Sequence, residues 1–296
     1  MKLLLLLGFA VFSLGNIVQA SALSIPQSAI AKLAEGIATS NSNIFAQANS
    51  APQTATSPLI QAAKEFLSLE RYELESVMEI TGDIPGTSFV SDAKIKTIVE
   101  APNKFKSQVT FVSPNGLEGK TYDIISNGSQ VWIYDYSTSQ YSVSDFKPFL
   151  QTREGFLIGA LSYFYLNTRS NIGSSNIIAN FLAKLPEQQL LQYFQRFSKL
   201  DLQSSVIRDE TIAGKTYKAY DIDATTRGFK ATAYIDSERG NLARVHLSGA
   251  KDGLQLASEE QIVNQTIPES IPEDTFMFNP PENAEQVEQQ ITIAPF

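Results

Sequence analysis

The sequence of 296 residues contains no cysteine and a single histidine, His246. Without cysteine the chain has no disulfide framework, no thiol chemistry and no lipid-modified cysteine. One histidine without a histidine or cysteine partner does not make a zinc-type site, and we interpret His246, within ARVHLSG, as an ordinary strand residue. We therefore expect no metal ion and no other cofactor.

Positive charge and catalytic motifs are also scarce. Lys and Arg number 23 against 31 Asp and Glu, which argues against nucleic acid and anionic membrane surfaces as partners. GLEGKT has two residues between Gly116 and Gly119, where a phosphate-binding loop needs four. The adjacent acids Glu259 and Glu260 would point to opposite faces of a strand, and we expect them to keep edges and turns soluble. With no G-x-S-x-G motif either, we expect a protein that is not an enzyme.

The amino terminus has the pattern of a secretion signal. Lys2 gives a basic start, Leu3 to Leu14 is mainly apolar, and VQA ends at Ala20. We predict a signal peptide over 1–20, cleavage after Ala20, and export to the periplasm. A membrane span needs about 20 apolar residues, and this apolar run is shorter. We therefore expect no integral membrane span after cleavage. The alternative is an uncleaved anchor.

Composition predicts where folding begins. Residues 21–57 are mostly Ala, Ser, Gln, Asn and Thr with few aromatics, which is typical of a disordered, low-complexity tether. Pro58 suits a first helical turn, and apolar residues follow it at helical spacing. The remaining residues can form one large antiparallel fold, so we predict a single domain over 58–296.

Strand-like runs with turn signals dominate this domain. A helical insertion at about 151–200 interrupts them, because FLIGALSYFYL from Phe156 is almost wholly apolar and Asn176 to Phe197 has a helical period broken at Pro186. The short connections leave no room for parallel crossovers. We therefore predict a mainly β fold with a curled antiparallel sheet, its strands lying at 72–80, 89–99, 105–112, 121–125, 131–136, 140–143, 204–210, 216–222, 229–235, 242–247 and 254–263.

The strand at 131–136 is apolar on both faces. Trp132 and Tyr134 share one face, while Val131 and Ile133 share the other. Because the aromatics are larger, we expect Trp132 and Tyr134 to face the concave interior and Val131 and Ile133 to face outward.

Three stretches resemble the LolA-like superfamily of periplasmic carriers: VEAPNKFKSQVTF, IISNGSQVWIYDYSTSQYSV and DTFMFNPPENAEQV. Within it, the chain is most similar to the branch of exported proteins known as DUF2092. The resemblance implies an unclosed, strongly curved antiparallel β-barrel of about eleven strands, capped by helices around a hydrophobic cavity. Members of the superfamily carry lipoproteins or lipids, and relatives act as sensors. The lipoprotein carrier has a basic residue before the Pro-Asn pair that helps to hold its lid, whereas this chain has Ala101, so that control does not transfer.

These observations predict a non-catalytic exported carrier or binding protein for a lipid, a lipoprotein acyl chain or a similar hydrophobic ligand. The alternative is a periplasmic sensor or interaction module that binds an envelope protein and whose apolar interior is only a core. In the carrier hypothesis ten residues line the cavity: Phe66, Phe105, Phe111, Trp132, Tyr134, Phe156, Leu157, Leu161, Phe164 and Phe181.

Overall fold

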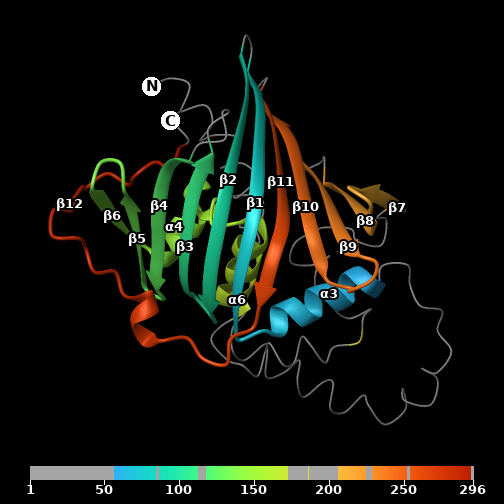
Figure 1. The fold of residues 1–296 in the computed structure, drawn as a ribbon, viewed down its shortest axis with the longest axis horizontal. Helices are drawn as coiled ribbons and strands as arrows, with labels where there is room; N and C mark the ends of the chain where they lie inside the picture. Colours follow the sequence, from blue (N-terminus) through green and yellow to red (C-terminus); the bar gives the residue numbers. More distant parts are fainter. Residues whose placement is uncertain are drawn as a thin grey trace.

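A broad sheet of twelve strands dominates the fold (Figure 1). The computed structural model describes residues 57–84, 87–112, 118–172, 186, 206–224, 229–251 and 254–294. The strand order is β12-β6-β5-β4-β3-β2-β1-β11-β10-β9-β8-β7, so β12 and β7 are the two edges within the described residues. The predicted mainly β fold, with an unclosed antiparallel sheet capped by helices, is confirmed.

The two halves of the chain meet at β1, which pairs with β2 on one side and β11 on the other. Neighbouring strands are antiparallel, except that β12 runs parallel to β6. The strands are β1 (Arg71–Ile84), β2 (Thr87–Glu100), β3 (Lys104–Val112), β4 (Glu118–Asn127), β5 (Gln130–Asp135), β6 (Gln140–Asp145), β7 (Val206–Ile212), β8 (Lys215–Ala224), β9 (Phe229–Asp236), β10 (Leu242–Lys251), β11 (Leu254–Thr266) and β12 (Glu285–Gln286).

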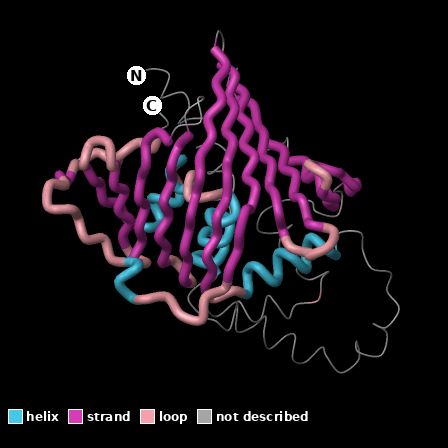
Figure 2. The backbone as a smooth tube through the Cα atoms, viewed as in Figure 1, coloured by secondary structure: helices cyan, strands magenta, loops and turns pink. Residues whose placement is uncertain are grey.

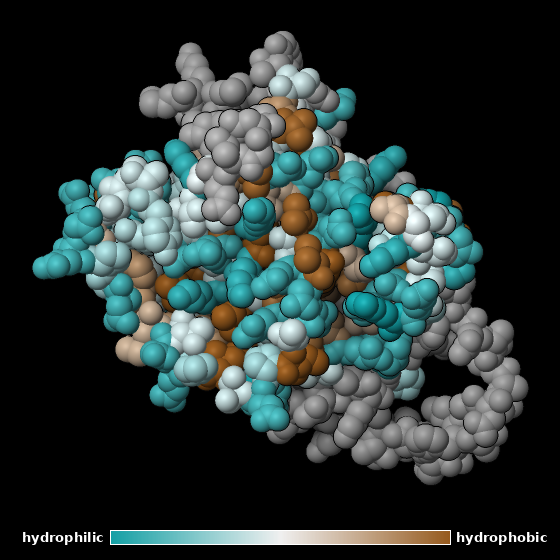
Figure 3. Space-filling view, in the orientation of Figure 1, coloured by the Kyte–Doolittle hydropathy of each residue, from teal (hydrophilic) through white to brown (hydrophobic). Residues whose placement is uncertain are grey.

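Alternating side chains separate the two faces of the sheet. In β3, Phe105, Ser107, Val109 and Phe111 are buried, while the residues that alternate with them are more exposed. This is the period of two that one buried face requires. On the outer face, Lys96 and Glu75 are cross-strand partners joined by a 3.0 Å ion pair. Figure 3 shows this face as mostly hydrophilic, with scattered apolar side chains.

Within the described residues, four α-helices accompany the sheet. Figures 1 and 2 show α4 (Phe146–Leu150) and α6 (Ala160–Ile172) behind it, on the inner face. The short helix α5 (Arg153–Phe156) connects to both, and α3 (Ser57–Ser68) contacts β9, β10 and α6. The helix predicted from Pro58 is confirmed.

The apolar run that starts at Phe156 is not one continuous helix. It is interrupted at 157–159, where Gly159 has a φ of +102°. The rest of the predicted insertion from residue 173, apart from Pro186, lies outside the described residues. So do the predicted signal peptide and all but Ser57 of the predicted tether, and the domain boundaries remain predictions.

The C-terminal strap, residues 267–294, runs from the end of β11 to the edge of the sheet formed by β6 and β12 (Figure 1). Its 3₁₀ turn η4 (Glu273–Phe276) contacts β3 and β4. Phe278 then stacks on Trp132 with ring centroids 6.1 Å apart. After β12 pairs with β6, Ile293 is buried in the inner core and the Tyr122 hydroxyl donates to the Ala294 carbonyl at 3.0 Å. The strap therefore touches both faces of the sheet.

Phe278→Ala is expected to lower the free energy of unfolding by about 2 kcal/mol, because it removes ring contacts to Trp132, Tyr134 and Tyr141. Urea denaturation followed by circular dichroism measures the change. Met277→Ala is the matched control, since Met277 is 58% exposed and its loss is expected to cost no more than about 0.5 kcal/mol. Equal losses for the two variants would show that the strap is not anchored through Phe278.

Candidate functional site

The space between the concave face and the helices is filled mainly by apolar and aromatic side chains. Phe66, Tyr72 and Tyr165 form a cluster with ring centroids 5.0 to 5.3 Å apart. Nearer the other end, Phe105 stacks on Phe149 at 5.9 Å. Both groups belong to one continuous core, which we call the interior.

Most of the predicted lining residues meet in this interior. Phe156 packs against it while partly buried, Phe164 lies outside it at 36% exposure, and Phe181 is outside the described residues. Five of the predicted residues are buried members of the interior: Phe66, Phe105, Phe111, Leu157 and Leu161.

The predicted orientation of β5 is wrong. Val131 and Ile133, 0% and 1% exposed, belong to the interior. Trp132 and Tyr134 lie on the outer face, where both contact Phe278. The strap covers that face and gives the larger aromatics a partner, so side-chain size did not indicate which face is concave.

A buried carboxylate joins the helical layer to the sheet. Glu260 on β11 is 1% exposed. Its Oε1 accepts a hydrogen bond from Ser76 Oγ on β1 at 2.7 Å, and its Oε2 accepts one from the Leu161 amide at 3.0 Å. The Ala160 amide also donates to this carboxylate. We call Glu260, Ser76 and the first amides of α6 the carboxylate latch.

Burial and hydrogen bonding act on Glu260 in opposite directions. Desolvation raises the pKa of its carboxyl, and the hydrogen bonds from Ser76, Leu161 and Ala160 lower it, with a net rise. The amides belong to a helix N-terminus, whose partial positive charge favours an anion. The latch is therefore a costly buried charge that the start of α6 offsets.

The loop before α6 is fitted to this carboxylate. A Cβ on Gly159 would lie 2.7 Å from Glu260 Oε1, and the φ of +102° already favours glycine. One residue earlier, the Ile158 carbonyl accepts a hydrogen bond from Thr97 Oγ1 at 2.9 Å, and Thr97 also shares one with Ser107 at 2.8 Å. Residues 158–161 thus hold the inner face through polar contacts within an apolar region.

The prediction for the acidic pair Glu259 and Glu260 was correct for their orientation and wrong for the role of Glu260. Glu259 and Glu260 do point to opposite faces, and Glu259 forms an ion pair with Arg244 on the outer face. The solvating role expected for the pair is wrong for Glu260, which is buried. The inward neighbours on β11 are not a clear apolar series, so the strand pattern did not reveal its burial.

Other chemistry is sparse in the part of the chain that the structure describes. It contains no group of three or more His, Asp or Glu residues placed to hold a metal ion. His246 lies in β10, as predicted, with Nδ1 3.9 Å from Glu259. None of the described helices has the length and apolar character to cross a membrane.

Comparison with known proteins finds similarity among solved structures only. No protein-family model matches the chain, and no curated protein matches it. A LolA superfamily protein from Nitrosomonas europaea is 13% identical, over 77% of this chain and 99% of that one, with a TM-score of 0.30. LprF from Mycobacterium bovis is 12% identical, over 74% and 95%, with a TM-score of 0.38.

A further match is MucB, which is 12% identical over 76% of this chain and 62% of that one, with a TM-score of 0.33. The solved structures similar to this chain thus include members of the superfamily that its motifs resemble. The DUF2092 branch remains a prediction.

Gly159→Ala is expected to lower the free energy of unfolding by about 3 kcal/mol, because the added Cβ crowds Glu260 and the backbone is strained. Gly240→Ala is the matched control: its φ is +73° and no atom lies within 4 Å of the added Cβ. There we expect only the conformational cost of about 1 kcal/mol. Equal losses by urea denaturation would mean that the latch does not crowd this position.

Glu260→Gln is expected to change the pH dependence of stability. The folded pKa of Glu260 lies above its ordinary value of 4.5, so the folded protein takes up this proton at a higher pH than the unfolded chain. This contribution to stability is complete below the unfolded pKa and is lost as pH rises through the folded pKa. The wild type should therefore gain stability relative to Glu260→Gln as pH falls from neutral toward 4.5.

Urea denaturation of both proteins across that pH range measures this difference. All other carboxylates are common to the two chains, so their contributions cancel to first order. Parallel profiles would contradict the raised pKa.

Proposed function

We propose that this protein is a non-catalytic exported carrier or binding protein for a lipid, a lipoprotein acyl chain or a similar hydrophobic ligand. The observation that supports it most is the interior, an aromatic-rich space covered by short helices. The layer includes α4, α5 and α6, with 5, 4 and 13 residues. Short elements over an apolar sheet face can move aside with few hydrogen bonds broken.

The carboxylate latch is the point at which such movement of the helices would be controlled. Apolar contacts between helix and sheet can be exchanged for contacts with an acyl chain, which gains about 0.8 kcal/mol for each buried methylene. The hydrogen bonds to Glu260 have no such substitute in an acyl chain. In this proposal the latch sets how readily α6 leaves the sheet, and the ligand lies against the concave side chains.

The N-terminal sequence is the basis for the proposed cellular location. A signal peptide over 1–20, cleaved after Ala20, would deliver the domain to the periplasm, and residues 21–57 would act as a tether. The partners are then hydrophobic ligands and envelope proteins, without nucleic acid and without an integral membrane span.

A second function is supported by the close packing of the interior. The rings of Phe66, Tyr72 and Tyr165 are in mutual contact, as in an ordinary core. In that case the protein is a periplasmic sensor or interaction module, and its surface binds an envelope protein.

Quenching of tryptophan fluorescence can distinguish the two proposed functions. Trp132 lies on the outer face, whereas Tyr163 belongs to the interior and its hydroxyl has no hydrogen-bond partner among the described residues. In the variant Trp132→Phe/Tyr163→Trp the only tryptophan is therefore inside. A brominated fatty acid, which quenches tryptophan on contact, is expected to quench this variant and to leave wild-type emission largely unchanged.

Organic extraction of the purified wild type, followed by mass spectrometry, is expected to show lipid that stayed bound. Equal quenching of both proteins would indicate binding to the outer surface instead of the interior. A folded variant that is not quenched, together with an empty extract, would refute the carrier and leave the interaction module.

A further inference from the structure

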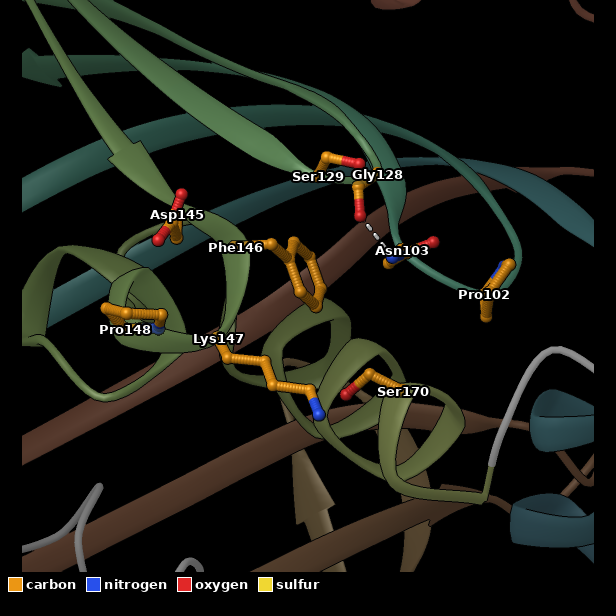
Figure 4. A pocket seen from close by; sticks show the side chains of 9 residues that line it. All are labelled: Pro102, Asn103, Gly128, Ser129, Asp145, Phe146, Lys147, Pro148 and Ser170. Carbon is orange, nitrogen blue, oxygen red and sulfur yellow. Dashed lines mark hydrogen bonds between the residues drawn. The ribbon is translucent and has the colours of Figure 1, made fainter.

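A pocket of about 480 Å³ opens at the end of the interior near the Pro-Asn turn (Figure 4). Four parts of the fold form it. Pro102 and Asn103 come from the β2–β3 turn, Gly128 and Ser129 from the β4–β5 turn, and Ser170 from the last turn of α6. The fourth side is the start of α4 with its preceding residue, namely Asp145, Phe146, Lys147 and Pro148.

Hydrogen bonds join the walls of this pocket to one another. The Asn103 side-chain amide donates to the Gly128 carbonyl, and Ser126 Oγ donates to the Asn103 carbonyl at 2.9 Å. The Phe146 amide donates to the Ser129 carbonyl at 2.9 Å. The two turns and the start of α4 are therefore joined before any ligand is present.

The pocket carries one positive and one negative side chain. Lys147 and Asp145 are exposed, and neither forms an ion pair within the part of the chain that the structure describes. Figure 4 shows Asp145 and Lys147 on either side of Phe146. The Lys147 ammonium extends toward Ser170, and the Asp145 carboxylate points away from Ser170. An anion at Lys147 alone would leave Asp145 opposed by a like charge, so a group bearing both signs fits better.

The pocket and the interior share one side chain. Phe146 lines the pocket and also belongs to the interior, where its ring lies 6.4 Å from that of Phe105. A shift of this ring would connect the polar pocket to the apolar space behind it.

We infer that this pocket binds the zwitterionic headgroup of a single-chain amphiphile, with a phosphate near Lys147 and an ammonium near Asp145, while the acyl chain passes Phe146 into the interior. The inference rests on the proposed carrier function and names the class of its ligand. It assigns polar recognition to α4 and the Pro-Asn turn, and leaves the apolar chain to the sheet and α6.

The test compares two lipids of equal chain length by isothermal titration calorimetry: a lysophosphatidylethanolamine and an uncharged monoacylglycerol. Wild type is expected to prefer the zwitterionic lipid. Lys147→Met and Asp145→Asn should each reduce that preference by about threefold, the usual scale for an exposed charge pair, without changing the affinity for monoacylglycerol. Lys215→Met, at the exposed start of β8, is the control and should change neither affinity.

Each other outcome overturns the inference in a distinct way. If both lipids bind equally and the Lys147 and Asp145 variants match wild type, the headgroup pocket is refuted and the carrier function stands. If only Lys147→Met has an effect, the site recognises an anion and the zwitterionic assignment fails. If neither lipid binds to wild type, the pocket assignment is refuted, and fatty-acid quenching of the Trp132→Phe/Tyr163→Trp variant decides the carrier function separately.

Discussion

The hydrogen-bonded carboxylate of Glu260 is the interaction on which the placement of α6 against the sheet depends. Apolar packing attracts α6 to the sheet but does not by itself fix its position, because it has little directional preference. The donors that meet Glu260 come from β1 and from the start of α6. A buried charge that is lowest in energy in one geometry therefore selects one placement of the helix among several that would bury similar apolar area.

The Glu260 carboxylate also lies where the two halves of the sheet meet. Glu260 is on β11, next to β1, and these two strands join the first series of strands to the last. Ser76 binds the carboxylate across this junction. The helical layer is thus fixed at the seam between the two halves, while α4 and the Pro-Asn turn lie farther along the first half. In the proposed carrier, recognition at the pocket and opening at the latch would therefore occur at different places.

Local patterns predicted most of this fold, and contacts distant in sequence account for what they missed. The alternation in β3 and the helix from Pro58 follow from neighbouring residues, so both could be predicted. Which face of β5 is buried depends on Phe278, far along the chain. The break before α6 places Gly159 against Glu260, which is remote in sequence. Both failures occur where an apparently surface residue is paired with a remote segment, which a strand or helix period does not encode.

The path of the C-terminal strap has a consequence for how the chain acquires its structure. The strap crosses from one face of the sheet to the other beside β6, and Ile293, close to the end of the chain, fills part of the inner core. Strands β1 to β6 precede the strap in the chain, yet their edge and part of their core are completed by residues of the strap. Such long-range closure slows folding. Strands β1 to β6 therefore keep an open edge and an incomplete core until the strap, which follows β11 in the chain, is in place.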